Sequence, residues 1–555
     1  MQSLEITIHL SSSYTETWKA YPGQAFLSWI IEHPKLIPTS VLGIIVHNHI
    51  EDLRTPLSTS CEIVPIGPGH PEYSRLFQQN LTSLFFAAAR SLEPQRQWKL
   101  GHSMGNGLFL EPHHFLPTPE MILEIANKMS KYCAEALPFS LETLDYRSAI
   151  AALSERSGTT VLDSMNDAVL SVTHIDGYRE LTLGPLALNA SSLVPFSLEP
   201  YSEGALLRYP AEFSVNRGSK IPEFLDIPFL SHIYKEHQRW SRILGVRTIG
   251  TLNHVTQTKS IKEYIWTAEA LQAGKINEIA QEIGHKAEAL RAILIAGPSS
   301  SGKTTFAKRL SIQLQAQGIK PKALSLDNFF LPRENTPRDE YGNYDFETLR
   351  ALDLELLNET ILGLMNGEMV ALPVFDFRVG DRYFPHSPEK LEKDEILVIE
   401  GIHGLNPELL LRIPKENIHK IYISALTQIN VDQSHRISTT DNRLVRRIVR
   451  DYRYRGHAAG ATLEMWSSVR RGEDVWIYPY QTLADAQFNS ALDYELGVLK
   501  PMAESLLRQV KPDQPSYTSA KRLLQILGYF LPIPREFVPD MSILREFVGG
   551  SAFKY

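Results

Sequence analysis

The sequence predicts a doubly wound α/β domain with a parallel sheet in its C-terminal half, preceded by a small β-rich domain and an α+β domain. Three observations support this prediction. After residue 290, short and almost fully apolar runs recur with helical segments between them, as expected for parallel strands that are buried on both faces. Residues 1–66 instead alternate apolar and polar side chains, which is typical of half-buried strands. The residues between these parts combine amphipathic helical stretches with short β-like pieces.

The composition excludes several classes of protein. Of the 555 residues, 43% are hydrophobic and 21% are charged, which is ordinary globular usage. A net charge of −7 argues against a protein that coats nucleic acid, although it leaves a local basic patch open. Two cysteines, Cys61 and Cys133, exclude a disulfide framework and a zinc–thiolate site, and favour a reducing compartment. The start does not resemble a signal peptide, and the apolar stretches are far shorter than the roughly 20 residues that span a bilayer, so we expect a cytoplasmic protein without membrane contact.

The first domain is expected over residues 1–66. Leu4, Ile6, Ile8 and Leu10 alternate with polar residues and predict a strand. A helical stretch at 25–32 and two further strand-like runs at 41–46 and 62–66 complete a strand–strand–helix–strand–strand unit. A Gly-Pro-Gly turn at 67–69 marks its end.

The middle of the chain predicts an α+β domain over residues 67–235. Helices are expected at 76–92 and 121–136, because each stretch carries its apolar residues on one face. Mixed-polarity helical sequence follows, and we expect a helical bridge at 236–270 before the C-terminal domain of 271–555.

The C-terminal domain shows the β–α–β rhythm of a doubly wound sheet. The apolar runs predict strands at 291–296, 322–326, 396–399 and 421–423, and helices are expected at 303–317 and 349–366. In such a sheet, ligands bind at the carboxyl ends of the strands.

One loop in this domain predicts a nucleotide site. Gly297-Pro298-Ser299-Ser300-Ser301-Gly302-Lys303-Thr304 matches G-x-x-x-x-G-K-[ST], directly after a buried strand and before a helix. Small residues let backbone N–H groups converge on phosphate oxygens at a helix N-terminus. Lys303 would reach the β- and γ-phosphates of ATP, and the Thr304 hydroxyl would bind Mg²⁺. The expected ATP contacts are Gly297, Ser299, Ser300, Ser301, Gly302, Lys303, Thr304 and Thr305. The alternative is a Gly/Ser-rich turn that caps a helix, which would need neither Lys303 nor Thr304.

Two acidic residues follow buried strands of the same predicted sheet. Asp327 ends the second apolar run, and Glu400 ends a later one. Both would project at the edge that carries the phosphate loop, where a carboxylate can hold Mg²⁺ or accept a proton from a substrate hydroxyl. The alternative is that each acid caps a helix or lies in a solvated turn.

Six arginines lie between residues 443 and 455. The first four, at 443, 446, 447 and 450, have the spacing of one helix face. Such a face would suit a lid that closes over transferring phosphates, because charge stabilisation dominates phosphoryl transfer. A solvated charged face and an RNA-binding helix are the alternatives.

With these residues in place, the stretch 285–500 resembles the uridine/cytidine kinase and phosphoribulokinase group of P-loop kinases. The matching motifs are the phosphate loop, Ser325-Leu326-Asp327-Asn328-Phe329-Phe330, Pro373-Val374-Phe375-Asp376-Phe377, Ile399-Glu400-Gly401 and Arg446-Arg447-Ile448-Val449-Arg450-Asp451. The resemblance implies a P-loop kinase fold, with Asp327 as general base toward a nucleoside 5′-hydroxyl and Lys303 as the second catalytic residue. It implies Mg²⁺ between Thr304, Asp327 and Glu400, and a lid that holds Arg447, Arg450 and Arg455. The implied substrate contacts are Asp327, Phe375, Arg382, Arg447 and Arg455.

The sequence departs from this family in its base-recognition residues. Uridine kinases usually read Tyr-Asp-Phe, then two residues, then His-Ser-Arg. Here Phe375 replaces the tyrosine, and Gly380-Asp381-Arg382 replaces His-Ser-Arg, so the histidine that would meet a pyrimidine is missing. His457 also stands where an arginine is usual.

The N-terminal half has a resemblance of its own. Residues 1–66 resemble a TGS domain, a small β-grasp-like module, and residues 70–230 are similar to the editing domain of threonyl-tRNA synthetase. The helical stretch at 73–90 has no histidine, and Thr182-Leu183-Gly184-Pro185 lacks the usual Cys/His pair, so we expect no editing. The combined architecture resembles a group of bacterial uridine kinase-like proteins.

We therefore expect ATP- and Mg²⁺-dependent phosphorylation of a small hydroxyl substrate, with a nucleoside favoured. A phosphoribulokinase-like sugar kinase is one alternative. An RNA-binding regulatory protein that uses ATP as a switch is another, in which the N-terminal half would bind RNA.

Overall fold

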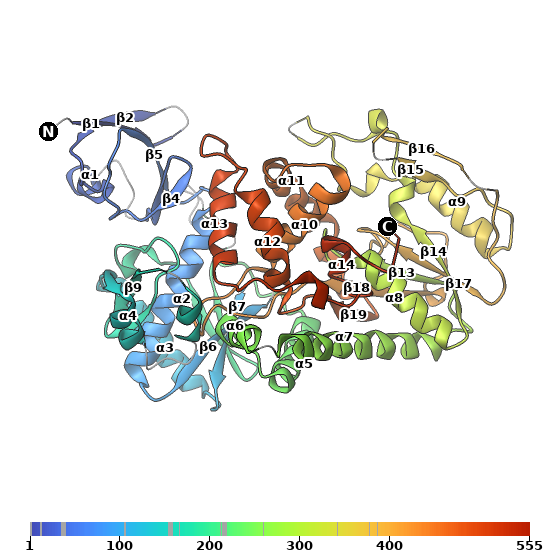
Figure 1. Ribbon diagram of the computed structural model, residues 1–555, viewed down its shortest axis with the longest axis horizontal. Coiled ribbons are helices and arrows are strands. Elements are labelled where there is room, and N and C mark those ends of the chain that lie inside the picture. The colour runs from blue at the N-terminus through green and yellow to red at the C-terminus, as the bar shows by residue number, and fades with distance from the viewer. Residues whose placement is uncertain are drawn as a thin grey trace.

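The computed structural model describes residues 3–11, 14–34, 40–104, 107–153, 159–165, 167–210, 213, 219–258, 260–340, 342–376, 378–385 and 387–554. Figure 1 shows a small N-terminal sheet and the C-terminal parallel sheet at opposite ends of the molecule. The C-terminal helices reach back to the first domain, since the Thr518 hydroxyl donates to the carbonyl of Asn48 at 2.6 Å.

The first domain is a five-stranded sheet with one helix. Its elements are β1 (Leu4–His9), β2 (Thr15–Ala20), α1 (Phe26–Glu32), β3 (Gly43–Val46), β4 (His49–Glu51) and β5 (Cys61–Ile66). The strand order is β2-β1-β5-β3-β4, and β1 and β5 run parallel. Alternation in β1 buries Ile6 and Ile8 against Phe26 and Trp29 of α1. The predicted strand–strand–helix–strand–strand plan is confirmed, with the short β4 as an addition.

The second part contains two antiparallel sheets and three helices. Its elements are α2 (Tyr73–Leu92), β6 (Gln97–Met104), β7 (Gly107–His113), α3 (Pro119–Ala134), β8 (Ser140–Asp145), α4 (Tyr146–Leu153), β9 (Val169–Ile175), β10 (Tyr178–Leu181), β11 (Ser197–Tyr201) and β12 (Gly204–Arg208). The sheets have the orders β11-β12-β7-β6 and β10-β9-β8. Helix α2 is the centre of this part, because Leu76, Phe77, Leu81 and Phe85 are fully buried in its core.

Three helices connect this part to the C-terminal sheet. They are α5 (Pro228–Leu244), α6 (Ile249–Gln257) and α7 (Ile261–Gly284). The helices extend beyond the residues 236–270 that the sequence indicates for a bridge. The apolar face of α7 continues through Ile276, Ile279 and Ile283, which are buried in the core of the C-terminal domain. Thus α7 is both a connection and a covering helix of that domain.

The C-terminal sheet has five parallel strands in the order β14-β17-β13-β18-β19. They are β13 (Ala292–Ala296), β14 (Lys320–Ser325), β17 (Glu395–Glu400), β18 (Ile418–Ser424) and β19 (Ala486–Asn489). The helices are α8 (Lys303–Ala316), α9 (Leu354–Met365), α10 (Thr439–Arg455), α11 (Ala459–Trp476), α12 (Glu495–Leu507), α13 (Tyr517–Gly528) and α14 (Arg545–Val548). A hairpin, β15 (Val374–Asp376) with β16 (Asp381–Tyr383), lies outside the sheet.

Both faces of this sheet are covered, as the apolar runs predict. Ile293 and Ile295 of β13 belong to the core that contains residues of α7, α8 and α10. The alternate residues of β13, Ala292 and Leu294, face the second core, which contains residues of α9. The sheet is therefore doubly wound, and its central strand β13 presents the phosphate loop at the carboxyl edge.

None of the described helices is both long enough and apolar enough to cross a membrane.

Candidate active site

The phosphate loop connects the central strand β13 to helix α8. Two of its backbone positions are left-handed, at Ser300 (φ 59°) and Gly302 (φ 82°). A Cβ on Gly297 would lie 2.1 Å from the carbonyl oxygen of Ile423, and a Cβ on Gly302 would lie 2.5 Å from the Ile543 side chain. A side chain at either position would therefore clash with its neighbours. Gly302 also has a left-handed backbone conformation, which favours glycine.

Lys303 begins α8 and folds back onto the loop. Its Nζ donates to the carbonyl of Gly297 at 3.0 Å and to that of Pro298 at 3.3 Å. Burial lowers the pKa of Lys303, and the charges of Glu400 and Asp327 oppose this shift. The ammonium is thus held where β13 ends, close to both predicted acids.

The two predicted acids lie at the same edge of the sheet. Glu400 ends β17 and accepts from the Ser325 hydroxyl at 3.0 Å and from the Thr304 hydroxyl at 3.5 Å. Asp327 lies in the short 3₁₀ turn Leu326–Phe329 that follows β14. Burial and the negative charge of Asp327 raise the pKa of Glu400 to about 7. The two carboxylates therefore repel each other beside Lys303.

This group has the donors that Mg²⁺ prefers. The described residues contain no cluster of three or more His, Cys, Asp and Glu side chains that could hold a metal ion. Mg²⁺ does not need such a cluster, because it usually takes one or two carboxylates and completes its shell with water and substrate phosphates. The Thr304 hydroxyl and the carboxylates of Asp327 and Glu400 fit that pattern, and a cation would relieve their repulsion.

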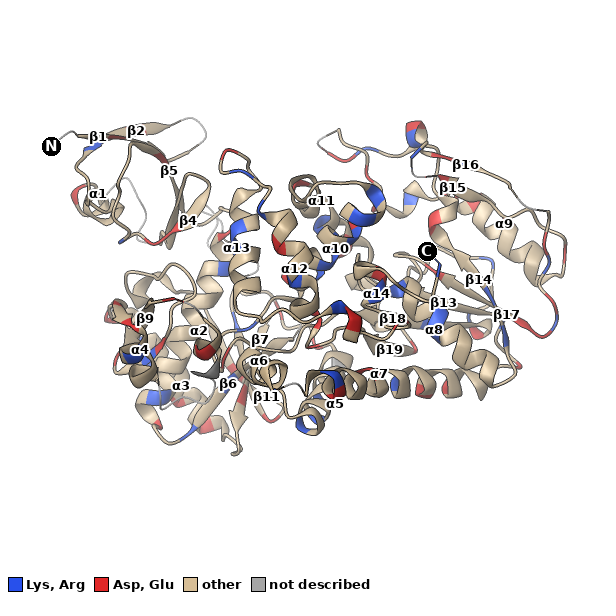
Figure 2. Cartoon of the chain, viewed as in Figure 1, with Lys and Arg blue, Asp and Glu red and all other residues tan. Residues whose placement is uncertain are grey.

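The arginines of α10 divide into two groups, and Figure 2 shows the basic residues along this helix. Arg443 and Arg446 are buried and pair with Glu473 of α11 and Glu495 of α12. They also hold the loop, because Arg443 Nε donates to the Ser299 carbonyl at 3.0 Å and Arg446 donates to the Ser300 carbonyl at 3.2 Å. The carboxylates thus neutralise these two arginines, and the arginines support the loop. The helical spacing instead predicts that they belong to one basic face that binds phosphate.

The second group surrounds a single acid. Arg447, Arg450 and Arg455 lie 3.2, 3.1 and 3.7 Å from the buried carboxylate of Asp451. Arg447 also donates to the Ser299 hydroxyl at 2.6 Å, which places it on the phosphate loop. Burial, and repulsion by Arg450, lower the pKa of Arg455 to about 10. Three cations share one carboxylate here, so surplus positive charge faces the loop.

The predicted substrate residues Phe375 and Arg382 face each other across the β15–β16 hairpin. Phe375 is buried, and its backbone N–H donates to the side chain of Asn328, the neighbour of Asp327, at 3.2 Å. Arg382 instead pairs with Asp353 at 2.7 Å. Phe377 of the same motif lies outside the described residues. The hairpin is thus attached to the turn that carries Asp327, and Arg382 points to an acid at the start of α9.

Two carboxylates outside the recognised motifs accept hydrogen bonds from backbone N–H groups of the loop region. Glu473 accepts from the Ser299 N–H at 2.9 Å. Glu546 of α14 accepts from the Thr305 hydroxyl at 2.6 Å and from the Thr305 N–H at 3.3 Å. Glu546 is far from the loop in sequence and follows no pattern, so only the folded chain reveals this contact. Its charge also acts on Lys303 and Glu400.

Part of the C-terminal domain is similar in sequence to known proteins. Residues 292–496 match the phosphoribulokinase/uridine kinase family. The uridine kinase of Brevibacillus brevis is 28% identical over 194 residues, which cover 34% of this chain and 80% of that protein. The uridine-cytidine kinase-like 1 protein of Mus musculus is 28% identical over 211 residues, which cover 37% of this chain and 34% of that protein. A solved structure, described as a possible uridine kinase from Bacillus stearothermophilus, is 19% identical, with a TM-score of 0.27, and covers 39% of this chain and 98% of that chain.

The matched segment begins at β13 and ends in α12, so it contains the phosphate loop, both acids and the arginines of α10. It excludes the first two parts of the chain and the C-terminal segment with Glu546. The C-terminal region, residues 292–496, is therefore a phosphoribulokinase/uridine kinase family domain.

Proposed function

We propose that this chain is an ATP- and Mg²⁺-dependent kinase that phosphorylates a small hydroxyl substrate, with a nucleoside favoured. The observation that supports this most is the convergence of Lys303, Asp327 and Glu400 at one sheet edge, beside surplus arginine charge. Uridine kinases among the relatives of residues 292–496 favour a nucleoside over a sugar.

Asp327 and Lys303 are the proposed catalytic residues. Asp327 accepts the proton of the substrate hydroxyl, whose oxygen then attacks the γ-phosphorus of ATP. The bond from that phosphorus to the bridging oxygen breaks, and ADP leaves with the bond's electron pair. Lys303, Arg447, Arg450 and Arg455 stabilise the charge on the transferred group, as positioning and electrostatics dominate this chemistry.

Thr304, Asp327 and Glu400 are the proposed holders of Mg²⁺. Bound there, the ion would neutralise charge between the β- and γ-phosphates. Glu400 takes part only as a carboxylate, and its raised pKa means that it needs the cation or a higher pH to be fully ionised. The backbone of residues 297–305 forms the proposed ATP cradle, with Arg450 from α10.

The acceptor would lie between the turn of Asp327 and the β15–β16 hairpin. Phe375 supports this placement, since its backbone is bonded to Asn328. To contact the substrate, Arg382 would have to break its ion pair with Asp353, so the position of its side chain would depend on whether substrate is bound. A histidine for a pyrimidine is missing from Gly380-Asp381-Arg382, so we propose a nucleoside without specifying its base.

For the N-terminal half, we propose a TGS-like domain at 1–66 and an editing-like domain at 67–235 that has lost its editing residues. The mixed sheet β2-β1-β5-β3-β4, together with helix α1, supports the first of these. A helical bridge and the kinase domain complete the proposed organisation.

ADP release measured across a panel of nucleosides, ribulose 5-phosphate and other sugars tests the function. We expect acceptor-dependent turnover with at least one nucleoside, and its loss in Asp327→Asn. Turnover with sugars alone would replace this proposal by the sugar kinase. Salt-sensitive RNA binding without any acceptor-dependent turnover would favour the RNA-binding regulatory protein.

A further inference from the structure

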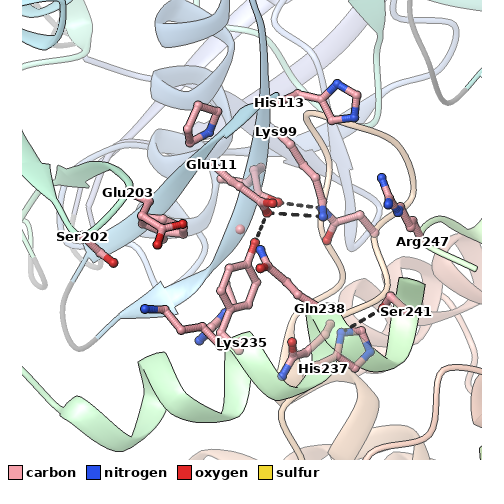
Figure 3. A pocket seen from close by; sticks show the side chains of 18 of the residues that line it. Lys99, Glu111, His113, Ser202, Glu203, Lys235, His237, Gln238, Ser241 and Arg247 are labelled. Atoms are coloured by element: carbon pink, nitrogen blue, oxygen red, sulfur yellow. Dashed lines mark hydrogen bonds and ion pairs between the residues drawn. The ribbon is translucent and has the colours of Figure 1, made fainter. Parts of the chain in front are cut away.

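A cavity of about 550 Å³ lies where three parts of the chain meet. Strands β6 and β7 of the second part form one wall, helix α5 forms another, and residues 427–436 of the loop before α10 close it. Figure 3 shows side chains from these walls pointing into the space. None of residues 297–305 lines the cavity, so it is separate from the phosphate loop.

The cavity contains the guanidinium of Arg436, which has no counter-ion among the described residues. Arg436 is half-buried and donates to the Ser103 hydroxyl at 2.7 Å. Burial lowers the pKa of Arg436, and the side chains that oppose this shift are the hydroxyls of Tyr209 and Tyr234. Within the part of the chain that the structure describes, no carboxylate lies within ion-pair distance of Arg436. Taking a charge out of water without a partner is unfavourable, so an anion from solution would be stabilised there.

The remaining charges of the lining are also mostly positive. Glu111 is already used, because it pairs with Lys99 at 3.4 Å and accepts from the Tyr234 hydroxyl. Lys235, Arg242 and Arg247 line the cavity and make no ion pair with the described residues. Glu203 is the lining carboxylate that remains to balance the charge of these three cations and Arg436. A ligand would therefore meet a net positive surface.

A buried histidine adds neutral hydrogen-bonding capacity. His102 is 4% exposed, and its ring makes no hydrogen bond of good geometry among the described residues, although the backbone of Leu230 lies close to it. Burial lowers the pKa of His102 to about 3, so the ring is neutral and offers one donor and one acceptor. Its ring lies against that of Tyr234, with centroids 4.4 Å apart, and Phe109 and Tyr201 are further aromatic lining residues.

We propose that this cavity is a second binding site, for a phosphate-bearing small molecule of nucleotide size. The phosphate would be bound by Arg436 and by the lining cations Lys235, Arg242 and Arg247, because a guanidinium matches phosphate oxygens in a bidentate way. The aromatic lining and His102 would contact the remainder of the molecule. The volume lies within the range of about 300–1,000 Å³ that is usual for small-ligand sites.

Calorimetric titration of the full chain with pyrophosphate and with uridine 5′-monophosphate tests this site. We expect saturable binding that weakens at least about tenfold in Arg436→Gln, since one charge-assisted contact is lost. The exposed pair Lys235→Gln with Arg247→Gln should weaken binding and reduce its salt dependence without affecting the fold. Arg239→Gln is the matched control, because Arg239 is exposed on α5 and does not line the cavity.

The phosphate loop could bind the same probes, so Lys303→Ala separates the two sites. Binding at the cavity should persist in Lys303→Ala, and this holds whether or not the chain is a kinase. Absence of saturable binding in the wild type, or equal affinity in Arg436→Gln and wild type, would overturn the proposal. Binding of an RNA 3′-end oligonucleotide without binding of either small probe would replace it by an RNA site.

Discussion

Glu546 is expected to compete with the nucleotide for the phosphate loop. The N–H of Thr305 belongs to the first turn of α8, where backbone donors lack partners within the helix and bind anions. Glu546 takes this donor and the Thr305 hydroxyl, at 3.3 and 2.6 Å. ATP that uses the same groups must displace the carboxylate and also approach its charge. The change Glu546→Gln keeps the size of the side chain and removes that charge.

The magnitude follows from the bond that ATP must break. A net contribution of about 1.5–3 kcal/mol is typical for a hydrogen bond to a charged group, against about 0.5–1.5 kcal/mol for a neutral one. The midpoints of these ranges differ by roughly 1.2 kcal/mol, which is about eightfold in a dissociation constant. Relief of charge repulsion acts in the same direction, so the affinity of Glu546→Gln for ATP should rise at least about tenfold. The free energy of unfolding should fall by about 1 kcal/mol, because the charged bond is lost.

Equilibrium titration of ATP with Mg²⁺, together with urea unfolding, measures both quantities. Glu536→Gln is the matched control from the same segment, since the Glu536 side chain is 69% exposed and pairs only with its neighbour Arg535 in the described structure. Truncation is a poorer test because Ile543 and Phe547 are fully buried. Unchanged or weaker ATP affinity in Glu546→Gln would refute competition and leave Glu546 as a support for Thr305.

Three further predictions concern the proposed kinase, and a fourth concerns the editing-like part of the chain. Lys303→Ala should abolish turnover while leaving the fold intact by circular dichroism, and near wild-type turnover would remove the assignment. Asp327→Asn should lower kcat at least about 100-fold, equivalent to about 2.7 kcal/mol, with ATP affinity changed much less. Raising Mg²⁺ should partly rescue Glu400→Gln and should rescue Asp327→Asn little, and an identical Mg²⁺ response in both would contradict their separate roles. The native state raises the pKa of Glu400 from 4.5 to about 7, so between these pH values the native state binds a proton that the unfolded chain releases. The free energy of unfolding should therefore fall as pH rises across this interval. Denaturation curves measured at several pH values should show that Glu400→Gln lacks this contribution to the pH dependence. Residues 67–235 should not hydrolyse mischarged threonyl-tRNA above background in the full chain, and clear deacylation would show that other side chains edit.

Local patterns were sufficient for most of the C-terminal fold. The strands β13, β17 and β18 are apolar runs because both of their faces are covered, and such runs are visible without any knowledge of partners. Strand β19 (Ala486–Asn489) has the mixed sequence AQFN and carries no such signal, although it pairs with β18. The β15–β16 hairpin is also not predicted, because each of its strands has three residues and is too short to show an apolar run.

The site was predictable where its residues belong to one motif or follow a strand. Lys303, Asp327 and Glu400 come together because the carboxyl ends of parallel strands share one edge, which is a rule of topology. Arg443 shows where this reasoning ends. Its helical spacing is visible in the sequence, but its partner Glu473 lies 30 residues further on, on another helix. Partners at that separation depend on how helices pack, and no local pattern encodes them.

The distribution of positive charge explains why the net charge of −7 says little about ligands. On α10, Arg446 is neutralised by Glu495, whereas Asp451 is the ion-pair partner that Arg447, Arg450 and Arg455 share among the described residues. A buried cation with its own carboxylate is satisfied and gains little from phosphate, but three cations around one acid repel each other and are relieved by an anion. The same criterion selects the cavity of Arg436, which has no carboxylate partner among the described residues. Both proposed anion sites of this acidic chain are thus indicated by arginines without a carboxylate of their own, and not by the total number of arginines.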